Sequence, residues 1–384
     1  MKFLKKLLTF LVIFFALVIA VLYITDTDYL LKAVRTIYLK GHSTAYLEDY
    51  KQFDNRVIEA SNNPQPWPNH AEYNSAEETQ TLKELNNASG TIAYVIIKND
   101  SIWFENYYNG FDEDSKSNSF SMAKSYVSGL MQMAIQQGYI KSLDQPVCDF
   151  LPAFCEGKAS KMTVGDLSSM SSGTNWDEAY YSPLSITTRA YFDDDLSKVI
   201  NGLKMATEPG QSFKYASGDT QMLAMVIEKA TGKKMYDYLE ESFWKPLGAE
   251  NEAFWQVDSE DHDLVKAYCC IASNAKDFAR YGKLFKDHGK WNGKQVLDSS
   301  FVAKSVKPRF SSTDLYGYGW WLANHRNKDI FYMRGHLGQL VIVIPDDDLI
   351  VVRLGHTITK TEGDGHSPDF YTFIDEAYEM MGKK

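Results

Sequence analysis

The sequence predicts an α+β fold in which one antiparallel sheet, flanked by helices, is built from strands near both ends of the chain and encloses a large helical insert. Two hairpin signals predict this sheet, because each pairs two apolar, β-rich runs across a short polar turn. Helical periodicity dominates the sequence between them. The chain has 384 residues, of which 44% are apolar, which is ample for a packed core. The predicted strands are residues 91–97, 101–107, 339–344 and 349–354, with turns at 98–100 and 345–348.

The first 25 residues are predicted to be a membrane anchor or signal segment. Lys2, Lys5 and Lys6 precede an uncharged, nearly all-apolar run from Leu7 to Ile24. A cleavable signal peptide has a shorter apolar region and a small-residue cleavage site, which this run lacks, so an uncleaved signal anchor is favoured. With the lysines on the cytoplasmic side, the rest of the chain would lie outside the inner membrane, in the periplasm or the extracellular space.

Two further regions follow this segment. Residues 26–88 are mostly polar and are turn-rich near 62–69, which favours a stalk and N-terminal extension, part of it wrapped on the domain. Residues 89–384 are predicted to form the catalytic domain. In its middle, residues 219–231, which end before Gly232, and residues 276–286 have the periodicity of core-facing helices.

A helical run from residue 120 to about 138 begins with a Ser-x-x-Lys motif, Ser121 and Lys124. Residues three apart lie on one face of a helix, so the amine would lie beside the hydroxyl. A serine hydroxyl is a weak nucleophile that needs an adjacent proton acceptor. The N-terminus of a helix also favours developing negative charge. The motif therefore predicts Ser121 as a nucleophile and Lys124 as its base.

Ser-x-x-Lys also occurs at Ser242 and at Ser273, so at least two of the three motifs are accidental. Around the first motif, apolar residues at helical spacing predict a buried face. The alternative for the polar side of this helix is a solvated face with a serine N-cap. The polar stripe consists of Ser121, Lys124, Ser125 and Ser128, and the apolar face of Met122, Ala123, Tyr126, Val127, Leu130, Met133 and Ala134.

Two later segments carry further candidate site residues. Tyr215 lies in a turn-rich stretch and could pass a proton if a neighbouring lysine lowered its pKa. In the segment from Arg334 to Gln339, the glycines would let a strand edge approach a ligand, and the Gln339 N–H could donate to an oxyanion. The alternatives are an ordinary loop tyrosine and a simple bulge or turn.

Composition excludes other classes of function. The net charge of −10, or about −13 without the three N-terminal lysines, argues against nucleic acid as a partner. The eight histidines are scattered and no metal-binding motif occurs, so neither a metal nor another cofactor is predicted. Cys148 and Cys155 could form a disulfide worth roughly 2 to 3 kcal/mol or remain two small buried side chains, whereas the adjacent Cys269 and Cys270 are not expected to bridge each other.

The order and spacing of the three motifs resemble the serine β-lactamase and penicillin-recognising fold, in its class C-like branch. Ser-x-x-Lys at 121, Tyr-x-Ser about 90 residues later and His-x-Gly about 120 after that carry the resemblance, which covers roughly residues 89 to 380. Within this branch the sequence is most similar to the 6-aminohexanoate-dimer hydrolase and esterase-like members, which have Tyr-x-Ser where β-lactamases have Tyr-x-Asn. Further stretches typical of the branch are residues 162–174, 243–249 and 316–321.

This resemblance implies a role for each motif residue. Ser121 would be acylated, Lys124 and Tyr215 would share the proton transfers, and the N–H groups of Ser121 and Gln339 would form the oxyanion hole. His336, followed by Leu337 and Gly338, replaces the lysine usual in β-lactamases, and Ser217 replaces their asparagine, so both departures weaken a β-lactamase assignment. The loop residues Asp177, Tyr180 and Tyr181 occupy the region where amide-hydrolysing relatives place a substrate-contacting tyrosine.

The resemblance therefore implies an exported, membrane-anchored serine hydrolase that cleaves a small ester or amide through an acyl-enzyme on Ser121. Its partners would be a small-molecule or peptide substrate and the inner membrane. D,D-peptidase or β-lactamase activity is an alternative, and a non-catalytic protein that binds a peptide or wall fragment is another. No Gly-x-Ser-x-Gly occurs, which argues against an α/β-hydrolase.

Overall fold

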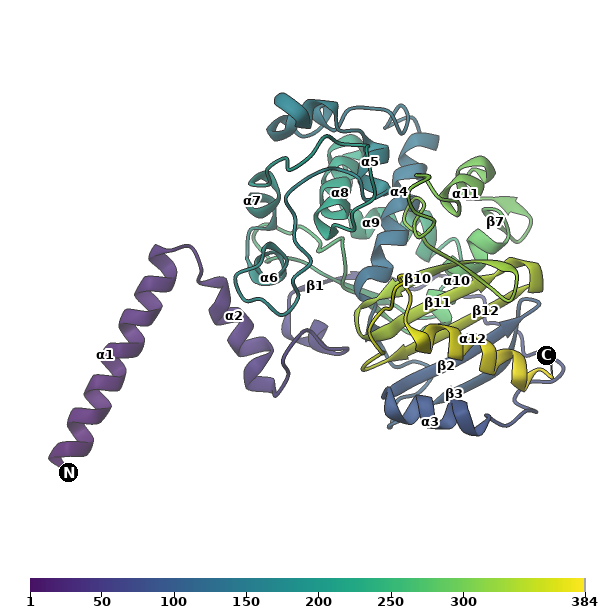
Figure 1. Ribbon diagram of the computed structural model, residues 1–384, viewed down its shortest axis with the longest axis horizontal. Coiled ribbons are helices and arrows are strands. Elements are labelled where there is room, and N and C mark those ends of the chain that lie inside the picture. The colour runs from purple at the N-terminus through teal and green to yellow at the C-terminus, as the bar shows by residue number, and fades with distance from the viewer. Residues whose placement is uncertain (383–384) are drawn as a thin grey trace.

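The computed structural model describes residues 1–382 and confirms the predicted α+β class. Its main sheet has six antiparallel strands in the order β3-β2-β12-β11-β10-β9, so strands from both ends of the chain lie side by side at its centre (Figure 1). The strands are β2 (Thr91–Lys98), β3 (Ser101–Tyr107), β9 (Trp321–His325), β10 (Lys328–Gly335), β11 (Gln339–Ile344) and β12 (Leu349–Gly355).

Successive side chains of a strand point to opposite faces of the sheet, and in this sheet both faces are covered by helices. On β2, Tyr94 and Ile96 join the core under helices α3 (Gln80–Ala88) and α12 (Pro368–Met380). Val95 and Ile97 join the larger core on the other face, where α10 (Ala275–Lys286) packs against the sheet. This continuous burial explains why the central strands are almost entirely apolar.

The helical insert lies beside the sheet and contains α4, whose residues are buried on nearly every side. The alternative of a solvated face on this helix is wrong, because Ser125 and Ser128 are buried and donate to the backbone carbonyls of Gly319 and Tyr318 at 2.6 and 3.0 Å. The insert consists of α4 (Ala123–Gln136), α5 (Val164–Ser168), α6 (Ile186–Phe192), α7 (Leu196–Asn201), α8 (Ser217–Thr231), α9 (Met235–Leu239) and α11 (Ser299–Ser305).

Segments within residues 26–88 pack against the domain. The strand β1 (Asn55–Ile58) pairs with β5 (Ala253–Gln256) about 200 residues later in the chain. Together with β6 (Ile271–Ser273) and β4 (Ser117–Asn118), these strands form a second antiparallel sheet in the order β1-β5-β6-β4. A separate hairpin joins β7 (Lys290–Trp291) to β8 (Lys294–Gln295).

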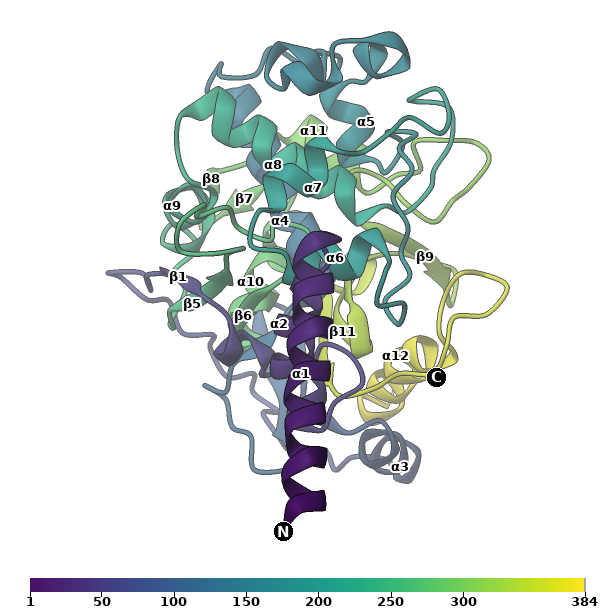
Figure 2. The ribbon, with the colours of Figure 1, turned by 90° about the vertical axis from the view of Figure 1, so that its left-hand side faces the viewer.

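The N-terminal helix α1 (Lys2–Ile24) projects from the domain and buries none of its residues (Figures 1 and 2). It has 23 residues and a mean hydropathy of 3.1, so by length and composition it could cross a membrane. The next helix, α2 (Tyr29–Thr36), turns back onto the domain and packs against α6. The segment that follows the apolar helix therefore becomes part of the wall of the domain.

Candidate active site

Ser121 lies in a single 3₁₀ turn, Phe120–Met122, immediately before α4. Phe120 has a left-handed backbone with φ 45°, which is strained for an aromatic residue. Its N–H donates to the Asn118 side chain at 2.9 Å, and Asn118 donates to the buried Asp49 carboxylate at 2.9 Å. These buried hydrogen bonds hold the strained turn and with it the position of the Ser121 hydroxyl.

Lys124 contacts Ser121 directly. The distance between Lys124 Nζ and Ser121 Oγ is 2.8 Å, and the amine also donates to the Tyr268 carbonyl at 2.6 Å. Only 2% of Lys124 is exposed, and this burial lowers its pKa to about 7. The negative charge of Glu178 opposes this shift by raising the pKa of Lys124, but by less than burial lowers it. Near neutral pH a substantial fraction of Lys124 is therefore an uncharged amine that can accept a proton.

The other two Ser-x-x-Lys motifs lack this geometry. Lys245 pairs with Glu240 at 2.5 Å, and Lys276 forms an ion pair with Glu113. Ser242 and Ser273 are buried, and neither hydroxyl has a hydrogen-bond partner among the described residues. Both of these lysines pair with a carboxylate and not with their serines, so among the three motifs only Lys124 contacts its serine hydroxyl.

Tyr215 lies close to Lys124, whose Nζ is 5.1 Å from the centre of the phenol ring. Burial raises the pKa of Tyr215, the Glu178 charge raises it further, and the neighbouring Ser121 hydroxyl opposes the rise. The sequence-based idea that lysine charge lowers this pKa is therefore wrong. Tyr215 therefore keeps its proton. It is suited to donate or relay a proton rather than to act as the initial base for Ser121.

The turn between β10 and β11 approaches the nucleophile closely. A Cβ on Gly335 would come within 2.2 Å of the Ser119 carbonyl oxygen, so only glycine fits there. The turn continues through Leu337 and Gly338, which have φ 63° and 84°. The Gln339 side chain faces away and donates to the Gly355 carbonyl at 2.7 Å, so Gln339 can contribute to the site through its backbone.

His336 is enclosed by aromatic rings. The ring centres of Phe120, Tyr180 and Tyr181 lie 5.5, 5.2 and 6.4 Å from its own. Burial lowers its pKa to about 4, so the imidazole is neutral at physiological pH. Its Nε2 atom is buried and has no hydrogen-bond partner among residues 1–382. A neutral imidazole cannot hold a carboxylate by charge as a lysine would.

Glu178 is a site residue that the sequence analysis missed. Its carboxylate accepts hydrogen bonds from the Ser217 N–H and, at 3.2 Å, from the Ser217 hydroxyl. Asp177, in the same loop, lines neither cavity at Ser121, and its carboxylate accepts the Ile186 N–H at 3.2 Å. Only its place in the same loop as Tyr180 and Tyr181 could have pointed to Glu178, because the partner Ser217 is 39 residues away.

Two cavities meet at Ser121, and Tyr180, Tyr181 and His336 line both of them. One has a volume of about 280 Å³ and extends below α2 and α6. The other has a volume of about 660 Å³ and runs along the β10–β11 turn, where its lining includes Glu178, Tyr215, Arg334 and Lys360. A carbonyl group at Ser121 could therefore place one substituent in each cavity.

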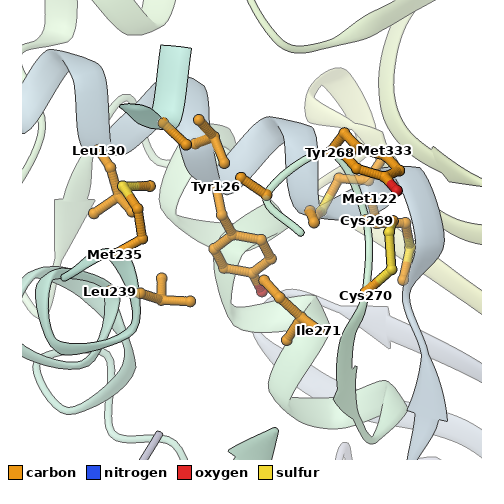
Figure 3. Close-up of a cluster of buried hydrophobic side chains, with 14 of the residues drawn as sticks. Met122, Tyr126, Leu130, Met235, Leu239, Tyr268, Cys269, Cys270, Ile271 and Met333 are labelled. Atoms are coloured by element: carbon orange, nitrogen blue, oxygen red, sulfur yellow. A yellow bond between two sulfur atoms is a disulfide. The ribbon is translucent and has the colours of Figure 1, made fainter. Parts of the chain in front are cut away.

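The cysteines form two disulfides. Cys148 pairs with Cys155, as one of the two alternatives predicted. Cys269 pairs with Cys270, which corrects the expectation that these neighbours would not bridge (Figure 3). The left-handed backbone of Cys270, with φ 80°, brings the two side chains together within the core behind the nucleophile. Cys269 and the adjacent Tyr268 form part of the wall of the smaller cavity.

Comparisons with known proteins agree with this geometry. A family model described as Beta-lactamase matches residues 79–368, about three quarters of the chain. The 6-aminohexanoate-dimer hydrolase of Paenarthrobacter ureafaciens is 24% identical over 286 residues, which cover 69% of this chain and 72% of that protein.

Two solved structures share the fold. A Bacillus anthracis protein, provisionally named a 6-aminohexanoate-dimer hydrolase, superimposes with a TM-score of 0.73 at 21% identity, covering 88% of this chain and 94% of its own. A D-stereospecific amidohydrolase from Streptomyces sp. gives a TM-score of 0.59 at 18% identity, covering 80% of this chain and 100% of its own. The chain therefore belongs to the Beta-lactamase family and is a serine hydrolase of this fold.

Proposed function

We propose that this protein is an exported, membrane-anchored hydrolase that cleaves a small ester or amide through an acyl-enzyme on Ser121. The observation that carries the proposal is the 2.8 Å contact between Ser121 Oγ and a buried Lys124 whose pKa is lowered to about 7. Such a pair supplies an activated nucleophile at neutral pH. The positions of Tyr215 and of the β10–β11 turn around the same hydroxyl support the assignment of a catalytic site.

In the proposed reaction, neutral Lys124 takes the hydroxyl proton while Ser121 Oγ forms a bond to the substrate carbonyl carbon. The N–H groups of Ser121 and Gln339 stabilise the negative charge on the carbonyl oxygen. The bond to the leaving group breaks, and the proton passes from Lys124 through Tyr215 to that group. Water then attacks the acyl-enzyme, gives a proton to Lys124, and releases the acid as Ser121 regains its hydrogen.

The site favours an ester or amide over a β-lactam as the substrate of this reaction. Neutral His336 lies where β-lactamases have a lysine that helps to hold the drug's carboxylate. Two of the similar proteins are named a 6-aminohexanoate-dimer hydrolase and a D-stereospecific amidohydrolase. Amide cleavage at Ser121 is consistent with both names.

The membrane location rests on the N-terminal helix. α1 buries none of its residues, is long and apolar enough to span a bilayer, and carries Lys2, Lys5 and Lys6 at its start. By the positive-inside rule these lysines remain in the cytoplasm, and the hydrolase domain is exported. Protease added to spheroplasts should then degrade the domain, whereas protection until the inner membrane is lysed would contradict export.

The catalytic proposal is tested by turnover of p-nitrophenyl acetate by the full-length protein in detergent. Ser121→Ala should lower kcat/KM at least about 10⁴-fold, because the groups of a nucleophile–base unit do not act independently. Ser242→Ala is a matched control, since it removes the unpartnered hydroxyl of another Ser-x-x-Lys motif. Equal activity of Ser121→Ala and the wild-type protein would overturn the proposal.

A further inference from the structure

The smaller cavity at Ser121 differs from the larger one in the charge of its lining. Among the described residues that line it, none is Asp, Glu, Lys or Arg, and its one titratable imidazole, His336, is neutral because burial lowers its pKa. The wall is formed largely by apolar and aromatic side chains, including Leu30, Ala33, Ile37, Phe120, Tyr191 and Phe192. Such a cavity favours an apolar group, since a charge would lose its hydration there without a partner.

The second cavity has the opposite character. Glu178, Arg334 and Lys360 line it, together with several threonines of the segment after β12. Tyr215 also lines this cavity but not the apolar one. In the proposed reaction Tyr215 passes the proton to the leaving group, so the leaving group belongs on this polar side. The acyl group, which stays on Ser121, is then left with the apolar cavity.

Part of the lining of the apolar cavity comes from the segment that follows the N-terminal apolar helix. α2 begins five residues after the end of α1 and supplies Val34, and Tyr38 follows in the next 3₁₀ turn; both line the cavity and are 45% and 53% exposed. Tyr181, from the loop before α6, also lines the cavity and is 69% exposed. A hydrogen bond of 3.0 Å from the Tyr29 hydroxyl to the Pro183 carbonyl joins these two segments.

We infer that the substrate is an ester or amide of an apolar acyl chain, which lies in the α2–α6 cavity, with a polar leaving group in the second cavity. This inference rests on the proposed function, because the chain must be attached to the carbonyl that Ser121 attacks. The exposed side chains of Val34 and Tyr38, in the segment that follows the N-terminal apolar helix, suit a chain delivered from a membrane lipid as well as one delivered from a soluble ester. Both sources share the same acyl chemistry.

The test is a series of p-nitrophenyl esters from acetate to octanoate with the full-length protein in detergent. Each methylene buried in the cavity should raise kcat/KM about fourfold, so octanoate should exceed acetate by about 4,000-fold if all six added methylenes are buried and by at least about 100-fold if four are. Ala33→Phe and Ala45→Phe, which fill the cavity from two different segments, should lower the octanoate-to-acetate ratio at least tenfold. Val57→Phe, at an exposed position of β1 outside the cavity, should leave that ratio unchanged.

The outcomes separate this inference from the function on which it rests. Ser121-dependent hydrolysis with no increase along the series, or with a ratio that the filling variants do not change, would overturn the acyl-chain inference alone. Absence of any Ser121-dependent turnover would overturn the proposed function and this inference with it. To distinguish the sources, the protein is reconstituted in phosphatidylglycerol vesicles, and fatty acid release there would assign a lipid source. Release from the soluble octanoate alone would assign a soluble one.

Discussion

The burial that lowers the pKa of Lys124 should also destabilise the folded protein, and Lys124→Met tests this cost directly. Burial lowers its pKa from 10.5 to about 7, a difference of about 3.5 pH units. At 1.36 kcal/mol per unit, the contribution of Lys124 to the free energy of unfolding differs by about 5 kcal/mol between a pH well below its folded pKa and a pH well above its unfolded pKa. The cost acts through desolvation of the ammonium group, since the side chain is only 2% exposed.

The sign follows from proton binding. Between about pH 7 and pH 10.5 the unfolded chain holds the lysine proton and the folded protein has lost it, so wild-type stability rises with pH in this window. Lys124→Met removes that dependence. The variant should be about 1 to 3 kcal/mol more stable than the wild type at pH 7, after loss of the hydrogen bonds of Lys124 to Ser121 and Tyr268. Its advantage should shrink by about 2 kcal/mol at pH 9.

The assay is urea unfolding of the full-length protein in detergent, followed by tryptophan fluorescence at pH 7 and pH 9. Lys83→Met, at an exposed position on α3, is the control and should change stability by less than about 0.5 kcal/mol at both values. Turnover by Lys124→Met should fall nearly as far as that by Ser121→Ala. A difference between wild type and Lys124→Met that does not change from pH 7 to 9 would refute the reasoning.

Two further predictions concern the proton transfers. Because only the neutral amine accepts a proton, kcat/KM should rise with pH through about 7 and then level off, and Glu178→Gln should move the midpoint to lower pH by removing a charge that raises the pKa of Lys124. A flat profile from about pH 5 to 9 would argue against Lys124 as the base. Tyr215→Phe should lower kcat/KM about 10²- to 10⁴-fold in the same ester assay, with Tyr139→Phe, at an exposed position, as control. Activity within threefold of the wild type would exclude Tyr215 from the proton path.

The hairpins at the two ends of the sheet were predictable because their signals are local. Apolar, β-rich runs around short turns identify β2, β3, β11 and β12 within one or two residues. The strands β9 and β10 were missed, because the outer strand β9 is partly exposed and its sequence is mixed in polarity. The pairing of β1 with β5 joins segments far apart in the chain and leaves no local signal.

The chemistry of the site was predictable only in part. The spacing of Ser121 and Lys124 predicted their contact, and the need for a neutral base predicted a lowered pKa. The burial that produces this shift depends on Tyr268 and on the surrounding helices, which spacing cannot reveal. Glu178 and the α2 wall of the apolar cavity were not predicted either, because their contacts are long-range. The Tyr29–Pro183 hydrogen bond that holds α2 in place spans 154 residues.

The measurement that tests the central claim most directly is the intact mass of the full-length protein after reaction with a fluorophosphonate. We expect a single adduct that maps to the peptide containing Ser121, is absent from Ser121→Ala and persists in Ser242→Ala. The adduct should form faster at pH 8 than at pH 6, because Lys124 loses its proton between these values. No adduct on protein shown by circular dichroism to be folded, or an adduct that remains in Ser121→Ala, would contradict an activated nucleophile at this position.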